Sequence, residues 1–184
     1  MEIYPLTHAH ASTAARLHIA GQPGTFITSL GQDVLTVIYR ALPQSPVGFG
    51  FAALDKESDA PIGFVSATTS IGRLLVEMAT RRIFQFLPPL LKVYAQHPRL
   101  AIRSVQTILY PYIVGGQDNG GNYKNLEPDT HSGKDDAPSP IASAELLSIM
   151  VEPQARSQGI GSLLMDALIS ECRQRRITSL DVTV

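Results

Sequence analysis

The chain lacks the multiple cysteines and the Cys/His spacing that stabilise small disulfide-bonded or zinc-binding domains. Its 184 residues include one cysteine, Cys172, and no tryptophan. A single thiol cannot form an internal disulfide, and no Cys/His spacing resembles a zinc site, so we expect no metal. One lone cysteine is typical of a reducing compartment, which favours a cytoplasmic location. The N-terminus lacks a basic segment followed by an apolar run, so no signal peptide is predicted.

The sequence also lacks an excess of positive charge and an uninterrupted apolar run. Charged residues make up 17% of the chain and the formal net charge is −1, so nucleic acid is not expected as a partner. The most apolar stretch, residues 83–114, contains prolines and basic side chains, whereas a membrane-spanning helix needs about 20 mostly apolar residues. No transmembrane segment is therefore predicted; docking of this stretch on a membrane surface is a minor alternative.

What is present is enough apolar sequence, 44%, for one globular domain over residues 1–184. Apolar periodicity predicts a strand at 2–7, helices at 8–20 and 26–42, and a hairpin of strands at 47–54 and 62–69. His18 falls on the apolar side of the first helix. Gly31 should weaken the second helix slightly.

The middle of the chain has a different composition. Residues 71–113 have a helical pattern that should break near Pro88-Pro89 and at Pro98. Residues 115–140 are rich in Gly and Asp and are expected to be a flexible loop. Residues 71–142 therefore form a predicted helical insertion plus loop. A strand at 144–151, a helix at 160–175 and a strand at 179–184 then form a β-α-β unit.

The connection inside this β-α-β unit predicts an anion site. It contains Arg156-x-x-Gly159-x-Gly161 immediately before and at the start of a helix. The first N–H groups of a helix have no internal acceptors, and the helix dipole favours negative charge there. Glycines remove the Cβ atoms that would keep a phosphate from the backbone. Arg156 either adds a charge-assisted donor or holds the loop.

Two common phosphate motifs do not fit. A P-loop needs Gly-Lys-Ser/Thr at its end, and this segment has no lysine. A dinucleotide-binding turn needs a third glycine, where this chain has Leu164. An ordinary helix-capping loop remains the simpler alternative.

The string Val151-x-Pro153-x-x-Arg156-x-x-Gly-Ile-Gly-x-x-Leu-Leu resembles the acetyl-CoA motif of the GNAT N-acetyltransferase superfamily over residues 144–184. The resemblance implies an α/β fold: a mixed, mostly antiparallel twisted sheet flanked by helices, here with a helical insertion before the CoA-binding strand. It implies acetyl-CoA as co-substrate. The backbone of Ile149, Met150 and Val151 would pair with pantetheine, and the loop and helix start would hold the pyrophosphate. These last residues are Arg156, Ser157, Gln158, Gly159, Ile160, Gly161 and Ser162.

Glu145 is the candidate general base. Some GNAT members place a catalytic glutamate six residues before the valine of the motif, as Glu145 stands to Val151. Simple strand alternation puts both residues on one face. A carboxylate there would take the proton of an amine, since alkylammonium groups are mostly protonated at pH 7. A solvated strand-end charge is the simpler alternative. Cys172, on the apolar side of its helix, is expected in the core.

The chain departs from the family in two ways. GNAT proteins usually continue beyond the strand ending near Val184, so we expect a domain incomplete at its C-terminus, with an exposed edge strand that favours a homodimer. The general acid is not identified; Tyr110, Tyr112 and Tyr123 are poor candidates. The insertion would form a substrate lid or a partner surface.

The sequence thus predicts acetyl transfer to a primary amine, first of a small molecule such as an amino sugar or amino-acid derivative. A protein N-terminus or lysine is the second candidate acceptor. A non-catalytic acyl-CoA-binding module and a transferase for longer acyl chains are the rival functions. A non-catalytic module would bind CoA but would not respond to mutation of Glu145.

Overall fold

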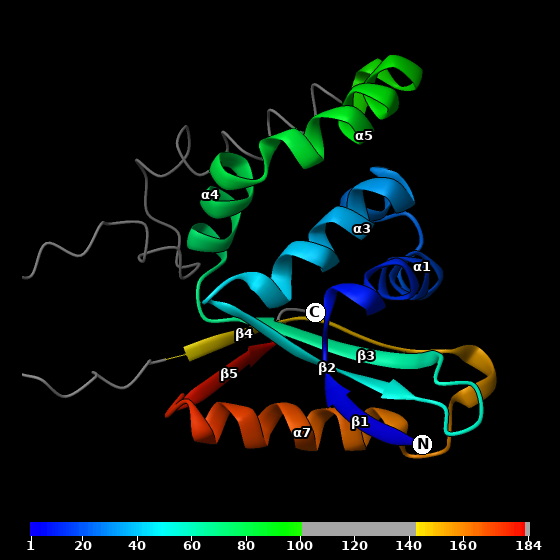
Figure 1. The fold of residues 1–184 in the computed structure, drawn as a ribbon, viewed down its shortest axis with the longest axis vertical. Helices are drawn as coiled ribbons and strands as arrows, with labels where there is room; N and C mark the ends of the chain where they lie inside the picture. Colours follow the sequence, from blue (N-terminus) through cyan, green and yellow to red (C-terminus); the bar gives the residue numbers. More distant parts are fainter. Residues whose placement is uncertain (101–142, 183–184) are drawn as a thin grey trace, which may run out of the picture.

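The chain forms a five-stranded sheet with helices on both faces (Figure 1). The computed structural model describes residues 1–100 and 143–182. The strands are β1 (Glu2–Pro5), β2 (Gly48–Leu54), β3 (Pro61–Thr68), β4 (Ser143–Val151) and β5 (Ser179–Val182). Their order follows the sequence, and every pairing is antiparallel except the parallel pair β4–β5. The mixed, mostly antiparallel sheet predicted from the sequence is confirmed.

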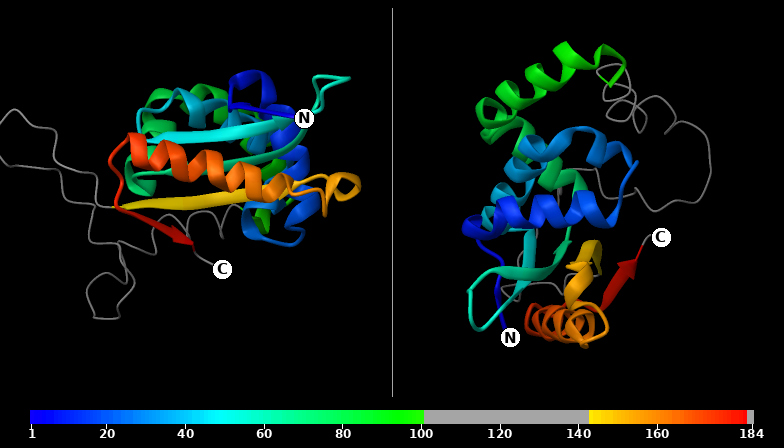
Figure 2. Two further views of the ribbon diagram at one scale, coloured as in Figure 1. Left: turned by 90° about the horizontal axis from the view of Figure 1, so that it is seen from below. Right: turned by 90° about the vertical axis from the view of Figure 1, so that its right-hand side faces the viewer.

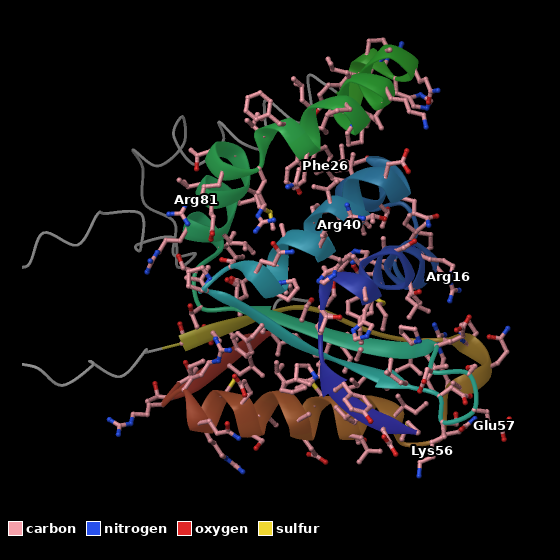
Figure 3. All side chains as sticks on the ribbon, in the orientation of Figure 1. Arg16, Phe26, Arg40, Lys56, Glu57 and Arg81 are labelled. Atoms are coloured by element: carbon pink, nitrogen blue, oxygen red, sulfur yellow. The ribbon has the colours of Figure 1, made fainter. Side chains whose placement is uncertain are left out.

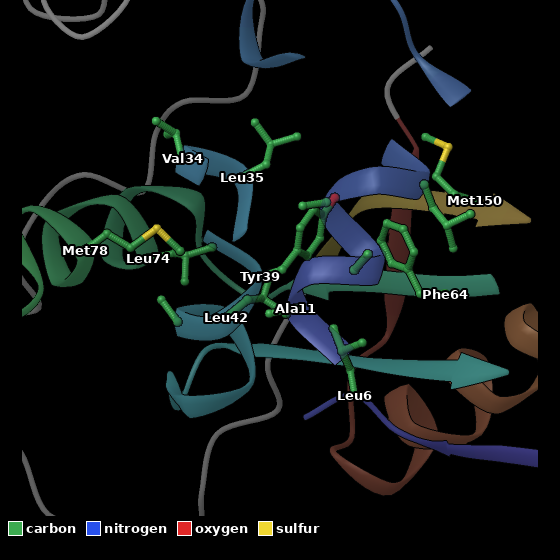
Figure 4. Close-up of a cluster of buried hydrophobic side chains, with 14 of the residues drawn as sticks. Leu6, Ala11, Val34, Leu35, Tyr39, Leu42, Phe64, Leu74, Met78 and Met150 are labelled. Carbon is green, nitrogen blue, oxygen red and sulfur yellow. The ribbon is translucent and has the colours of Figure 1, made fainter. Parts of the chain in front are cut away.

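Each face of the sheet has its own core, because apolar residues alternate along the strands. On β3, Phe64 packs beneath α1 (Ala11–Gly21) and α3 (Gly31–Ala41), while Val65 packs on α7 (Ile160–Gln174). Leu164 and Leu168 of α7 are fully buried. Figure 2 shows α7 lying alone across its face, and Figure 4 shows Tyr39 and Phe64 within the other core. Three short 3-10 turns are His8–His10, Leu42–Gln44 and Pro153–Ala155.

The single helix expected at 26–42 is wrong. The chain instead forms α2 (Phe26–Ser29), capped by the Thr25 hydroxyl, and then α3. The break falls at Gly31, whose φ of +81° lies in the left-handed region that glycine adopts without steric cost. Gly31 therefore ends one helix and redirects the next, which is more than the slight weakening expected from its propensity.

The break expected at Pro88-Pro89 is also wrong. After α4 (Ile71–Arg81), a single helix α5 (Ile83–Gln96) continues through both prolines. Each proline fixes a helical φ but leaves a carbonyl one turn earlier without its N–H donor. Those carbonyls belong to Phe84 and Gln85, whose side chains are exposed, so water can reach this part of the helix. The remainder of the predicted insertion, 101–142, lies outside the described residues, as do Tyr110, Tyr112 and Tyr123.

A β-bulge divides β4 into two halves. Ser66 of β3 pairs with Ser148 while the next residue, Ala67, pairs with Leu146, which leaves Leu147 as the extra residue of β4. The bulge reverses the alternation of side chains. Ile149 and Val151 therefore lie on the α7 face, whereas Glu145 lies on the face of α1 and α3.

The expectation that Glu145 shares the face of Val151 is therefore wrong. The packing of its sequence neighbours agrees with this assignment, because Ala144 and Leu146 both pack on the α7 face. Sequence spacing alone assumes unbroken alternation, and the bulge removes one step of it.

Within residues 1–100 and 143–182, no helix has the length and apolar character needed to cross a bilayer. The same ranges hold no cluster of three or more His, Cys, Asp or Glu side chains arranged to ligate a metal ion. Cys172 is buried between α7 and the sheet, as expected for a core thiol.

Candidate active site

The loop between β4 and α7 has the backbone shape of an anion site. Two of its residues have positive φ, Ser157 at 62° and Gly159 at 76°, and they alternate with ordinary residues. Such alternation turns successive N–H groups to one side and forms an anion-binding nest. Gly159 is also the N-cap of α7, so the unpaired N–H groups of the helix start adjoin the nest.

An open pocket of about 350 Å³ lies at this loop. Its lining residues are Val151, Ala155, Arg156, Ser157, Gly159, Ile160, Gly161 and Ser162. A Cβ atom built on Gly159 or Gly161 would meet no atom within 4 Å, so the pocket reaches the backbone at both glycines. An anionic group can therefore contact the helix start directly, which is the fit that a pyrophosphate requires.

Arg156 holds the loop as well as lining the pocket. Its Nε donates a hydrogen bond to the Val151 carbonyl at 3.1 Å and so joins the loop to the last residue of β4. Bound in this way, the guanidinium is positioned at the pocket with further N–H donors on its Nη atoms. Both roles expected for Arg156 are thus compatible with one conformation.

The β5-facing edge of β4 is paired over only part of its length. β5 pairs with Ser143 to Leu146, and in the described residues no strand pairs with that edge from Leu147 to Val151. On its other edge, β4 pairs with β3 as far as Val151. Ile149, Met150 and Val151 therefore present backbone groups along an open edge that leads to the anion pocket.

Glu145 lies at the other end of this open edge, beside a second carboxylate. Its register partner in β5 is Asp181, and the two side chains share a face of the sheet. Burial raises the pKa of Glu145, and the negative charge of Asp181 raises it further. A raised pKa moves a carboxylate towards the range in which it can exchange protons at neutral pH.

A buried polar cluster on the face of β4 that packs under α1 and α3 was not foreseen from the sequence. The cluster consists of His18 of α1, Tyr39 of α3 and Ser148 of β4, which hydrogen-bond to one another. The Ser148 Oγ lies 3.1 Å from His18 Nδ1 and 3.3 Å from Tyr39 Oη. Burial lowers the pKa of His18 and raises that of Tyr39. The signal was His18 on an apolar stripe, which requires a buried polar partner.

Arg16 and Ala155 were also missed. Arg16 of α1 makes two hydrogen bonds to Glu152, the residue between β4 and the loop, at 3.0 and 3.3 Å. Ala155 lines the pocket beside Arg156. Of the predicted cofactor residues, Ile149, Met150 and Gln158 do not line the pocket; the first two lie on the open strand edge and Gln158 bonds back to the Gln154 carbonyl at 3.4 Å. The pairing of Arg16 with Glu152 joins residues 136 positions apart, so no local sequence pattern indicates it.

Known proteins share both the sequence pattern around the anion loop and the overall fold. Residues 133–184 match the sequence model of the Acetyltransferase (GNAT) family. A solved structure of the aminoglycoside N-acetyltransferase AAC(6')-Iy in complex with CoA has 14% identity and a TM-score of 0.51, with 100% of this chain and 76% of that chain covered. A GCN5-related N-acetyltransferase from Ralstonia eutropha also has 14% identity and a TM-score of 0.51, covering 100% and 82%. No curated protein matches the chain.

The whole described chain therefore has the GNAT fold, a class defined by the mixed sheet and the anion loop. The sequence match to the Acetyltransferase (GNAT) family covers residues 133–184, which include the β4–α7–β5 unit. The neighbouring structures are too distant in sequence to transfer substrates.

Proposed function

We propose that this protein is an acetyl-CoA-dependent N-acetyltransferase that acts on the primary amine of a small molecule. One observation carries the proposal: the open edge of β4 leads directly from the Glu145 carboxylate to the anion pocket at the start of α7. This arrangement suits a ligand with a pyrophosphate at one end, an extended amide-containing arm and a reactive group at the other end.

In this proposal the chain binds acetyl-CoA at three places. The loop Arg156–Ser162, including Gln158, and the first turn of α7 hold the pyrophosphate. The backbone of Ile149 to Val151 pairs with the pantetheine amides as an added strand would. Five strand residues, 147–151, span about 16 Å, which directs the thioester towards the bulge and Glu145.

The Glu145 carboxylate takes one proton from the acceptor ammonium, directly or through a water. The neutral amine nitrogen then attacks the thioester carbonyl, the C–N bond forms, and the C–S bond breaks to release the thiolate, which is protonated as it leaves. In this proposal, backbone N–H groups on the open edge of β4 stabilise the oxyanion. No residue of the described chain is assigned as the acid.

The acceptor class follows from the two carboxylates at the acceptor end. Glu145 and Asp181 lie side by side on one face, which favours a cationic ligand such as an ammonium group over a neutral or anionic one. An aminoglycoside, a small polyamine, is the substrate class named for the similar enzyme AAC(6')-Iy. An amino sugar or a related small amine is therefore the acceptor that we propose.

Calorimetric titration with acetyl-CoA tests the cofactor site. Gly159→Glu should weaken binding by about 2 kcal/mol or more, a factor of roughly 30 in Kd, because its carboxylate meets the pyrophosphate. Gly24→Glu is the matched control, since Gly24 also has positive φ, 83°, and open space around its Cβ position. Equal weakening by both variants, or unchanged binding to Gly159→Glu, would contradict the proposed site.

An acceptor screen with the same protein tests the chemistry. Glu145→Gln should lower kcat by roughly 100-fold or more with unchanged acetyl-CoA affinity. Glu57→Gln, in the exposed β2–β3 turn labelled in Figure 3, should leave both unchanged. If Glu145→Gln retained full activity, the base would lie elsewhere. A protein that binds acetyl-CoA but acetylates no amine would be the acyl-CoA-binding module considered above.

The proposal includes a reducing, cytoplasmic location, supported by the single buried thiol Cys172. β5 is the edge strand of the described sheet, and pairing of two copies along it is the homodimer that the sequence predicts. Light scattering on the purified chain measures that association directly.

A further inference from the structure

The outer side of α4 and α5 is unusually apolar for an exposed surface. Ten large hydrophobic side chains are exposed in the described chain, and six of them fall between residues 75 and 91. These six are Leu75, Val76, Ile83, Phe84, Leu87 and Leu91. Phe84 is 84% exposed, the highest value among the ten. Such clustering marks a contact surface, whereas scattered exposed hydrophobics need no explanation.

On α5 the exposed residues form one stripe with helical spacing, at positions 83, 84, 87 and 91. A second stripe, Phe86, Leu90 and Val93, lies beside it and packs against the core under α3. The apolar side of α5 therefore extends beyond its contact with the core, and one of its two stripes faces outwards. Figure 1 shows α5 as the element farthest from the sheet.

The two helices are fixed to the rest of the molecule. The Ser45 hydroxyl donates to Glu77 of α4 at 2.6 Å, and Arg82 donates to the Gln44 side chain at 2.8 Å. Lys92 of α5 pairs with Asp33 of α3 at 3.2 Å. The stripe is thus presented on a supported platform rather than on a detached helix.

The segment that carries this apolar face is basic, although Arg81 pairs with Glu77 and Lys92 pairs with Asp33 of α3. Residues 71–100 contain Arg73, Arg81, Arg82, Lys92 and Arg99 against the single acid Glu77, a net charge of +4 in a chain whose total is −1. Arg81 lies at the end of α4 next to α5 (Figure 3). Leu and Phe on one side with Arg and Lys around them is the pattern of helices that lie in a membrane interface.

We propose that the α4–α5 face docks on an anionic lipid bilayer surface. Phe84, Leu87 and Leu91 enter the headgroup region, and the surrounding arginines contact lipid phosphates. A second copy of the chain fits this face less well, because apposing two copies brings two segments of net positive charge together, even with Asp33 paired to Lys92. The helices α4 and α5 are on the same side of the sheet as Glu145, because Leu74, Met78 and Phe86 belong to the core under α1 and α3.

Vesicle co-sedimentation with the full chain tests this proposal without any enzymatic readout. Vesicles of phosphatidylcholine with one third phosphatidylglycerol should bind the chain at least about tenfold more strongly than phosphatidylcholine alone, and the difference should shrink at high salt. Phe84→Asp and Arg73→Glu should each weaken binding by about tenfold. Leu163→Asp, which changes an exposed leucine of α7 on the opposite face, should bind as the parent does.

Two results would overturn the proposal. One is equal binding, or none, to the anionic and neutral vesicles by a chain with a folded circular dichroism spectrum. The other is a parent that is dimeric by light scattering and becomes monomeric in Phe84→Asp, which would show that a second copy covers this face. Failure to bind acetyl-CoA would leave the vesicle result unaffected, so the two proposals are tested separately.

Discussion

Arg16 on α1 holds Glu152, at the start of the anion loop, through two parallel hydrogen bonds of 3.0 and 3.3 Å. The paired fork geometry is the strong form of an arginine–carboxylate contact. Figure 3 labels Arg16 on α1, above the turn that follows β4. The contact joins the helical layer to the loop and neutralises a carboxylate close to the proposed pyrophosphate site.

Arg16→Ala should therefore affect binding more than stability. The pair is partly exposed, so the free energy of unfolding should fall by about 1 kcal/mol or less. The freed Glu152 charge should weaken acetyl-CoA binding by about fivefold at low salt, and by less at high salt. Glu152→Gln in the Arg16→Ala background should restore most of the affinity. A double variant as weak as Arg16→Ala would show that loop position matters instead of charge.

The acidic limb of the pH–activity profile should depend on Asp181. Burial and then the Asp181 charge raise the pKa of Glu145, so activity should appear at a higher pH than for an ordinary glutamate. Asp181→Asn removes the repulsive charge, lowers that pKa and should move the acidic limb of kcat/KM to lower pH. Asp166→Asn, on the exposed side of α7, is the control and should not move it. If the acidic limb did not move in Asp181→Asn, the charge of Asp181 would not be raising the pKa of the catalytic carboxylate.

Protonation of His18 should destabilise the fold. Its folded-state pKa is lowered by burial, so the unfolded chain binds a proton more readily below the usual value of about 6.5. The contribution of neutral His18 to the free energy of unfolding is then fully present above about pH 6.5, and it is lost as the pH falls through the lowered pKa of the folded state. The pKa of His10 is lowered too, by burial and by His8, so the pH-dependent loss of stability is compared between the parent and a His18 variant. Urea unfolding at pH 7.5 and 5.5 should show a smaller loss for His18→Gln than for the parent.

Gly161→Ala should have opposite effects on folding and binding. Its φ is not in the left-handed region and a Cβ there meets no atom within 4 Å, so alanine should stabilise α7 by up to about 1 kcal/mol. The same methyl group enters the pocket and should weaken acetyl-CoA binding by about tenfold. Chemical denaturation and calorimetry measure the two effects separately. If binding and stability rose together, the anion would lie away from Gly161.

The local sequence was sufficient where one short segment determines the structure. Arg156, Gly159 and Gly161 predicted the strand, loop and helix that the structure contains, because each requirement lies within a few residues of the next. The hairpin β2–β3 was predicted equally well, from two short strand patterns separated by a polar turn. The mixed, mostly antiparallel sheet flanked by helices came from the family resemblance.

The sequence did not predict the features that depend on contacts between distant residues or on single backbone angles. The φ of Gly31 and the bulge at Leu147 are backbone choices that propensity and alternation do not encode. The cluster of His18, Tyr39 and Ser148 joins residues up to 130 positions apart. Its only advance signal was a histidine and serines in otherwise apolar segments, and a buried histidine has many alternative partners.

The extra residue in β4 makes the two halves of that strand out of frame with each other. If Leu147 were deleted, the remaining register partners would form an uninterrupted ladder, and Glu145 and Leu146 would keep the faces that they have now. The deletion would instead remove the local bend and added twist that a bulge gives to its strand. A single codon thus sets the angle between the Glu145 end of β4 and its open edge, without deciding which side of the sheet either half presents.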